Sequence, residues 1–357
     1  MIGPFFGSTI RLIAVGAIFA TGFCNGQVAS TAKPTAITPK QAQAKTVAAK
    51  PAVKKILRTK RRKRSGMRKA APKVALKVLA GTLPRTVAAS PKLQVQVPVA
   101  MIKPSEGFQK SIPWGKPGTK IGDETINPID QMLFVWIPAG DFDLGTNDTD
   151  ADGGLLSAKP VKHIHLSGFW MGKYPVTWDQ YARYCKVAGT PVPADPGFTK
   201  TGVHPVIHVN WTDAIAYAHW AHVALPTEFQ WEHAARGPQN SKYPWGDSWN
   251  ANMCANSVSY RLTGSVPVGS YQGSKSAYGC FDMAGNVSQW CSNWFNKDYS
   301  SITGSDPTGP PTGTMRAVRG AGWGAISSVV FRSSFRYHLD PTLRLDIVGF
   351  RCAVRFP

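Results

Sequence analysis

The sequence predicts an α+β domain with few helices and abundant irregular structure, whose loops are held by aromatic packing. Segments with helical spacing are few, whereas tryptophan and glycine are unusually frequent. All 12 tryptophans and all 20 acidic residues of the 357-residue chain lie after residue 105. This distribution is expected if only that part buries enough apolar surface to offset the entropy of folding. We therefore expect one folded domain, at residues 106–357.

Two stretches near the start of this domain show strand patterns. In "MLFVWIPAGDFDLGT", an apolar run, a Pro-Ala-Gly turn and alternation at Phe142 and Leu144 predict a hairpin. The stretch "VKHIHLSGFWMGKYPVT" again alternates with period two, which places His163 and His165 on the same face. Two imidazoles on one face can ligate zinc or copper. No third ligand follows from the spacing, so we expect a structural or surface role for this pair.

Three segments have helical spacing. The first, "TWDQYARYCKVAG", ends at Gly189. The second follows Thr212 as the candidate N-cap and carries an aromatic stripe that includes Tyr217. The third follows Thr227, which forms a capping box with Gln230, and ends at Gly237.

The N-terminal part has a different character. Residues 1–105 carry 20 of the 41 lysines and arginines, while residues 106–357 hold 21 basic and 20 acidic residues. Residues 1–30 resemble a signal peptide, because Arg11 precedes the apolar run "LIAVGAIFATGF", which is shorter than the ~20 residues that span a bilayer. We expect export to the periplasm or the extracellular space. A lipoprotein anchor at Cys24 and an uncleaved membrane tether are the alternatives, although Phe23 stands where a lipoprotein needs a small residue.

Residues 31–105 form a basic linker rich in Ala, Lys and Pro. Like charges at this density and the near absence of aromatics predict disorder. The linker would serve as a tether, or it would contact polyanions through its charge. We expect no sequence-specific nucleic-acid binding. After the signal, five cysteines remain without metal-type spacing, so zero to two disulfides are expected.

Eight segments resemble one family in their order along the chain. They are "FVWIPAGDFDLGT", "YPVTWDQYARY", "HPVIHVNWTDAIAYAHWA", "LPTEFQWEHAARG", "YPWGD", "YGCFDMAGNVSQW", "RAVRGAGW" and "GFRCAVR". Over about residues 131–356 the chain is similar to the formylglycine-generating enzyme, or sulfatase-modifying factor, family. The resemblance implies a single domain with a C-type-lectin-like topology and little regular secondary structure.

The resemblance also shows what is missing. The family enzyme oxidises a cysteine of a nascent sulfatase to formylglycine with two cysteines that hold copper(I), a metal that prefers thiolate. Those positions fall near Ala325 and Val330, and no cysteine occurs between Ser292 and Arg351. The serine of the family's Gly-Gly-Ser-aromatic turn is replaced by Gly322. We therefore assign no catalytic residue and expect neither copper nor the family's oxidase activity.

The family also implies a calcium site in "DMAGNVSQW". Its candidate ligands are Asp282, the carbonyls of Gly285 and Val287, and Gln289. One carboxylate mixed with carbonyl oxygens suits a hard cation. Gln289 stands where the family usually has glutamate, which would weaken the site. The alternative is a packed corner that depends on its glycine.

The terminal segment lines the substrate groove in the family. Trp323, Arg332, Arg344 and Trp290 are therefore the candidate groove residues, because planar guanidiniums grip carboxylates, phosphates or peptide carbonyls and aromatic rings can form a floor. Core packing is the alternative for the tryptophans. For Arg336 and Arg351 we expect structural roles.

Together these features predict an exported formylglycine-generating-enzyme-like domain without the family activity. It would act as a binding or accessory module of the cell envelope, with a protein, a peptide or an envelope component as its ligand. The alternative is a cysteine-independent oxidoreductase on the same scaffold, similar to periplasmic maturation-type enzymes.

Overall fold

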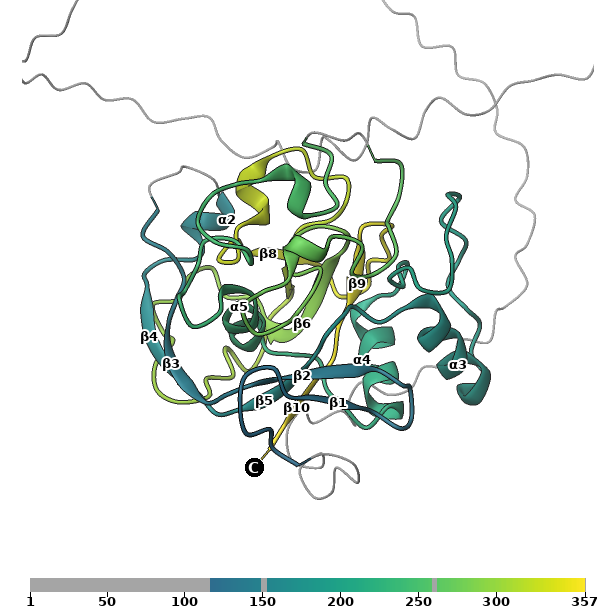
Figure 1. The fold of residues 1–357 in the computed structure, drawn as a ribbon, viewed down its shortest axis with the longest axis horizontal. Helices are drawn as coiled ribbons and strands as arrows, with labels where there is room; N and C mark the ends of the chain where they lie inside the picture. The colour runs from purple at the N-terminus through teal and green to yellow at the C-terminus, as the bar shows by residue number, and fades with distance from the viewer. Residues whose placement is uncertain (1–115, 149–152, 259–261, 357) are drawn as a thin grey trace, which may run out of the picture. The chain divides into compact units, whose positions relative to one another are not determined.

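The computed structural model describes residues 116–148, 153–258 and 262–356. The predicted signal peptide and basic linker lie outside these ranges. Short strands, few helices and long connecting segments make up the described chain (Figure 1). This composition confirms the α+β class. No helix in the described ranges is both long and apolar enough to cross a membrane.

The strands of the described ranges form three sheets. Their bounds are β1 Glu124–Ile126, β2 Leu133–Ile137, β3 Gly140–Leu144, β4 Lys162–Leu166, β5 Phe169–Gly172, β6 Ser288–Trp294, β7 Arg316–Arg319, β8 Tyr337–Leu339, β9 Val348–Phe350 and β10 Ala353–Arg355. The first sheet has the order β1-β2-β5-β10, and β3 pairs with β4 as a separate ribbon. The third sheet has the order β8-β7-β6-β9, with β6 and β9 parallel.

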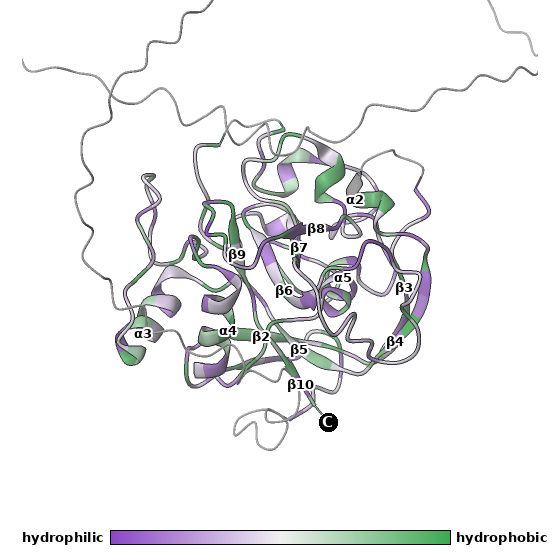
Figure 2. Cartoon of the chain, turned by 180° about the vertical axis from the view of Figure 1, so that it is seen from behind, coloured by the Kyte–Doolittle hydropathy of each residue, from purple (hydrophilic) through white to green (hydrophobic). Residues whose placement is uncertain are grey.

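The inner strands of the first sheet are buried on both faces because their side chains alternate between two cores, whereas the edge strand β1 is largely exposed. In β2, Phe134 and Trp136 enter the core that contains α3 and α4, whereas Val135 and Ile137 enter the core around α5. Figure 2 shows β2 and β10 in the green of apolar residues. A strand buried on both faces has a continuous apolar run, and "LFVWI" has one.

The predicted hairpin between β2 and β3 is wrong. β2 pairs with β1 and β5, whereas β3 pairs with β4. The strand positions were correct, but their apolar patterns differ. β2 is apolar on both faces, while β3 alternates exposed Asp141 and Asp143 with buried Phe142 and Leu144, which suits a ribbon with one exposed face.

The helices begin and end close to the predicted positions. Their bounds are α2 Gly153–Leu156, α3 Trp178–Ala188, α4 Trp211–Trp220 and α5 Glu228–Arg236, with 3₁₀ turns at Ala251–Met253, Gln272–Ser274 and Ser328–Phe331. The capping box of Thr227 and Gln230 is confirmed, and so are the stops at Gly189 and Gly237. The N-cap of α4 is Asn210 rather than Thr212, because the Asn210 side chain accepts a hydrogen bond from the Asp213 amide.

Helix α5 lies in the middle of the domain (Figure 1), and every residue from Glu228 to Ala235 is buried. Its His233 packs against the Phe142 ring and lies 3.3 Å from the Tyr278 hydroxyl. The Nδ1 atom of His233 has no hydrogen-bond partner among the described residues. Burial lowers the pKa of His233 to about 4, since a charged imidazole would be poorly solvated there.

This pKa predicts an acid-sensitive contribution to stability. Between pH 6.5 and about 4 the unfolded chain binds a proton at His233 that the folded protein rejects, so His233 favours unfolding as the pH falls. We expect His233→Gln to become more stable relative to wild type as the pH falls. The difference between their free energies of unfolding, measured in urea, should grow by on the order of 2–3 kcal/mol from pH 6.5 to about 4. A pH-independent difference between the two proteins would contradict this.

Candidate functional site

The terminal segment begins with a tight glycine turn after β7. Gly320 has φ +95°, and a Cβ there would lie 2.8 Å from the Trp231 ring of α5. Its carbonyl accepts a hydrogen bond from the Gly285 amide at 2.7 Å. Only glycine combines this backbone conformation with so close an approach. The turn therefore presses the terminal segment against α5.

The next two positions show how the turn departs from the family sequence. Ala321 has φ +56°, a left-handed conformation that strains a residue with a Cβ. At Gly322, a Cβ would lie 2.9 Å from both the Cβ and the carbonyl oxygen of Ile347. The family serine does not fit here unless Ile347 moves.

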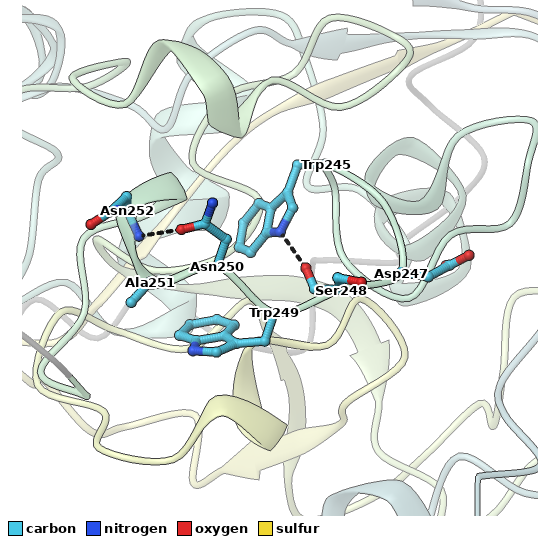
Figure 3. Close-up of a pocket in the computed structure, with 7 residues that line it drawn as sticks. All are labelled: Trp245, Asp247, Ser248, Trp249, Asn250, Ala251 and Asn252. Carbon is cyan, nitrogen blue, oxygen red and sulfur yellow. Dashed lines mark hydrogen bonds between the residues drawn. The ribbon is translucent and has the colours of Figure 1, made fainter. Parts of the chain in front are cut away.

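Two cavities stand out in the described part of the chain. One is a surface hollow of about 740 Å³ lined by residues 245–252 (Figure 3). The other, of about 80 Å³, is enclosed mainly by the terminal segment, and we call it the apolar pocket. Its walls include Ala325, Val330, Phe335, Leu339 and Ile347.

The apolar pocket is lined by the two residues near which the resemblance places the family cysteines. Ala325 and Val330 line it together, and its lining includes no cysteine, histidine or methionine. The five cysteines of the described chain are buried elsewhere and form no disulfide. Burial raises the pKa of Cys280 to about 11 and that of Cys254 to about 12, so these thiols stay protonated. The donors that copper(I) needs are absent from this pocket, and the residues present do not fit the metal.

The two candidate tryptophans have different environments. Trp290 is fully buried and its Nε1 donates to the Val209 carbonyl, so the prediction that it lines a groove is wrong. It lies on β6, in the centre of a sheet that is covered on this face. Trp323 is half-buried, donates its Nε1 to the Asp346 carbonyl at 3.1 Å and contacts the Phe198 ring edge-on. Asp346 lines the apolar pocket, so Trp323 supports its wall from outside.

The two candidate arginines form ion pairs with distant segments. Arg332 donates to Asp148 at 2.8 Å and is nearly buried. Arg344 is half-exposed and pairs through both terminal nitrogens with Asp213, the acid in the first turn of α4. Neither residue lines the apolar pocket. Arg344 remains accessible to a ligand, whereas Arg332 ties the terminal segment to the loop after β3.

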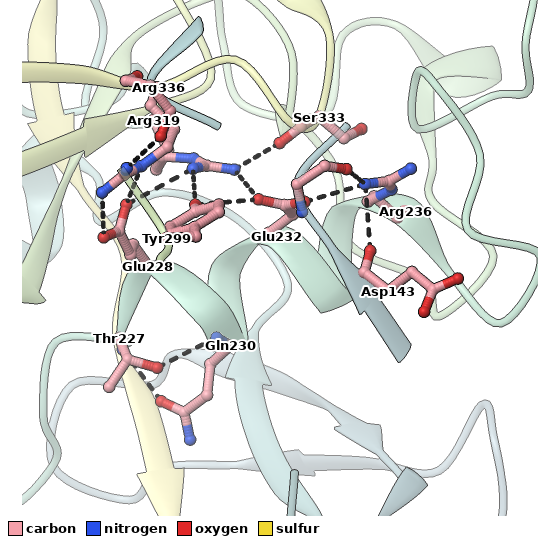
Figure 4. A network of polar contacts seen from close by, with 12 residues as sticks. Asp143, Thr227, Glu228, Gln230, Glu232, Arg236, Tyr299, Arg319, Ser333 and Arg336 are labelled. Carbon is pink, nitrogen blue, oxygen red and sulfur yellow. Dashed lines mark hydrogen bonds and ion pairs between the residues drawn. The ribbon is translucent and has the colours of Figure 1, made fainter. Parts of the chain in front are cut away.

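Behind the pocket lies a network of buried charges on α5 (Figure 4). Arg336 donates to both carboxylate oxygens of Glu228, at 2.9 and 2.6 Å. Arg319 donates to Glu232 at 2.6 Å and to the Tyr299 hydroxyl at 3.2 Å. All five side chains are nearly inaccessible to solvent. Arg319 also lines the apolar pocket, so the network holds one of its walls.

The network keeps its charges in the interior. Burial by itself would raise the pKa of Glu232, but the guanidiniums of Arg319 and Arg236 hold this pKa below its usual value. Arg236 donates to Glu232 at 3.0 Å, and the Gly145 amide donates to the same oxygen at 2.8 Å. Every carboxylate oxygen of Glu232 thus has a donor. A buried ion pair is stable only when its polar atoms have hydrogen-bond partners of this kind.

The predicted calcium ligands lie in a corner that the chain itself fills. The Oε1 atom of Gln289 accepts from the Trp231 indole at 2.8 Å and from Arg351 at 2.6 Å, which uses both of its lone pairs. Its amide nitrogen donates to the Asp282 carbonyl at 2.7 Å, which also accepts from Arg351. Gln289 is therefore not available to a cation, and the Arg351 guanidinium already supplies a positive charge.

The Asp282 carboxylate and the Gly285 amide hold two neighbouring loops. Asp282 accepts from the Gly269 amide at 2.8 Å, and burial raises the pKa of this carboxyl to about 6. The Gly285 amide bonds to the Gly320 carbonyl, while Val287 packs in the core. This arrangement agrees with the packed, glycine-dependent corner that was the alternative to calcium. The structural roles expected for Arg336 and Arg351 are confirmed.

His163 and His165 share the exposed face of the β3–β4 ribbon, as expected. Each ring nitrogen Nδ1 bonds to the aspartate directly opposite, His163 to Asp143 at 3.0 Å and His165 to Asp141 at 2.7 Å. No group of three or more His, Cys, Asp or Glu side chains in the described ranges has an arrangement suited to a metal ion.

Sequence reasoning missed most of the pocket wall. Phe335, Leu339 and Ile347 are apolar residues of the terminal segment, but nothing in their spacing distinguishes them from core residues. The available signal was the resemblance to the family, which places the two reactive positions near Ala325 and Val330.

Comparisons with known proteins found a matching family model, similar sequences and a similar fold. The family model described as sulfatase-modifying factor enzyme 1-like domain matches residues 120–356. The formylglycine-generating enzyme of Thermomonospora curvata is 32% identical over 286 residues, covering 62% of this chain and 92% of that enzyme. The serine/threonine-protein kinase Pkn1 of Chlamydia trachomatis is 32% identical over 259 residues, but this chain spans only 39% of the kinase. The structure of PvdO from Pseudomonas aeruginosa is similar in fold, with a TM-score of 0.59 at 24% identity over 66% of this chain and 99% of PvdO.

The buried network predicts unequal costs for two ion-pair variants. Glu232→Ala leaves Arg319 and Arg236 without their shared carboxylate in the interior, so we expect a loss of about 3–5 kcal/mol in the free energy of unfolding. Arg344→Ala removes a half-exposed pair and should cost less than about 1 kcal/mol. Urea denaturation of the two variants tests this. Similar losses would show that burial does not determine how much each ion pair contributes to the free energy of unfolding.

The corner at Gln289 predicts that calcium does not stabilise the domain. We expect the same melting temperature with excess calcium as with a chelator, because protein donors occupy the Gln289 oxygen. Magnesium at equal ionic strength is the control for unspecific salt effects. A saturable rise in melting temperature with calcium alone would contradict the expectation.

Proposed function

Because the chain belongs to the sulfatase-modifying factor enzyme 1-like family, we propose that it is an exported, non-catalytic member that acts as a binding or accessory module of the cell envelope. One observation carries this proposal. Ala325 and Val330, which stand near the positions of the family cysteines, line a pocket whose walls are mostly aliphatic and aromatic. The scaffold around this centre is retained, but its metal ligands are not.

The apolar pocket suits a small apolar group of a ligand, such as an aliphatic side chain of a peptide. A cavity of about 80 Å³ with these walls offers mainly dispersion contacts. Arg344 is accessible on the same terminal segment and would contact a carboxylate or a carbonyl of the ligand. The basic linker would tether the domain or contact polyanions of the envelope.

The alternative, a cysteine-independent oxidoreductase, makes a different prediction about metals. A non-catalytic module purifies without a stoichiometric redox metal, whereas an oxidoreductase that depends on copper or iron retains it. Metal analysis of the full chain, purified without added chelator, separates the two.

A cysteine-restoring variant tests whether the apolar pocket is the altered family centre. We expect the full-length wild type, loaded with copper, to leave a cysteine-containing sulfatase peptide unmodified. The double variant A325C/V330C should gain copper(I) binding, because both side chains line one cavity. A325S/V330T is the matched control, since it adds oxygen in place of sulfur and should bind no copper(I).

Two results would overturn the proposal. Formylglycine formation by the wild type would show that the chemistry survives without the cysteines. Equal copper(I) binding by the wild type and A325C/V330C would show that other residues hold the metal. Melting curves of the variants confirm that each is folded.

A further inference from the structure

The surface hollow at residues 245–252 is a second candidate site. It shares no lining residue with the apolar pocket, so what it binds goes beyond the function proposed above. Trp245 and Trp249 line it together with a short run of polar residues (Figure 3). Both tryptophans are half-buried and pack against a core cluster, and we call this pair the tryptophan shelf.

The local backbone holds the tryptophan shelf in place. Tyr243 and Gly246 exchange two backbone hydrogen bonds, of 2.8 and 3.0 Å, across a tight turn in which Gly246 has φ +130°. The Trp245 indole donates to the Ser248 carbonyl at 3.0 Å, which fixes the orientation of its ring. Asn250 then caps the 3₁₀ turn by accepting from the Asn252 amide. Little ordering remains to be done when a ligand arrives.

The two indoles contact each other with their ring planes inclined. Their centroids lie 5.9 Å apart at 52°. Tyr243 stacks on Trp245 at 5.4 Å and 8°, and the buried Phe331 supports Trp249 at 5.1 Å. Because the rings contact each other, they leave no gap that could enclose a cation in an aromatic cage. Their exposed surface suits a flat apolar face instead.

The polar lining excludes an anionic ligand. It consists of one carboxylate, one hydroxyl and two amides, from Asp247, Ser248, Asn250 and Asn252, and it has no lysine, arginine or histidine. The Asp247 carboxylate would repel phosphate or sulfate. Hydroxyl, amide and carboxylate groups together both donate and accept hydrogen bonds, which suits a neutral polyol.

We propose that the tryptophan shelf binds a neutral glycan built of pyranose rings with equatorial hydroxyls. Such a ring presents a flat face of C–H groups, which packs on an indole by dispersion, and a rim of hydroxyls, which bonds to the polar side chains. The hollow is an open surface depression, so it would contact one face of the glycan and leave the other face in solvent.

Calorimetric titration of the full chain tests the proposal with two probes, cellotetraose and chitotetraose. We expect both to bind, with affinities that differ little between low and high salt because no charge is neutralised. Trp245→Ala and Trp249→Ala should each weaken binding by about tenfold or more, since each removes a stacking surface. Trp220→Phe, at a half-buried tryptophan of α4 outside the hollow, is the control and should bind like the wild type.

A further variant guards against unfolding of the tryptophan variants. Asp247→Ala changes an exposed side chain that also accepts a hydrogen bond from the Lys242 amide at 2.9 Å, so its melting temperature is measured beside its binding, which we expect to be weaker. Absence of binding by both glycans at millimolar concentration would overturn the proposal. Binding that survives both Trp245→Ala and Asp247→Ala would do the same. Neither result bears on the apolar pocket, whose cysteine variants test the proposed function separately.

Discussion

The charge pairing on α5 is the constraint on which the rest of the structure depends. Glu228 and Glu232 lie in the interior on a helix without an exposed face, where an unpaired carboxylate would cost several kcal/mol. Two arginines neutralise them: Arg319, the last residue of β7, and Arg336, which directly precedes β8. Arg336 also reaches the Ser157 carbonyl, so one helix connects segments from three parts of the chain.

This pairing also places the apolar pocket. Arg319 ends β7 and leads directly into the turn at Gly320, which approaches the Trp231 ring of α5 too closely for any side chain. The path of the terminal segment is thus set by contacts that do not involve the family's reactive cysteines. Ala325 and Val330 line the apolar pocket that this path encloses.

Hydrogen bonds within the chain also hold the corner around Gln289. Gln289 and Arg351 join the indole of Trp231 to the backbone of Asp282 through hydrogen bonds within the chain. An amide and a guanidinium together satisfy carbonyl groups that a calcium ion would otherwise coordinate. Ile347 likewise occupies the space above Gly322 where the family has a serine side chain.

The sequence alone determined the features that depend on near neighbours and on motif order. The capping box of Thr227 and Gln230 and the stop at Gly189 rest on contacts within one turn, so they were predictable. Family membership followed from eight ordered segments, and with it the topology and the positions of Ala325 and Val330. These conclusions need no knowledge of distant partners.

Only the tertiary structure decided which residues meet across the chain. It directed β2 and β3 into different sheets, placed Trp290 in the core and left Trp245 and Trp249 only partly buried, beside the surface hollow. The local sequence around a tryptophan does not tell whether its ring is buried or exposed, because exposure depends on which distant residues pack over the ring. The arginine partners likewise depend on long-range packing, which local spacing does not encode.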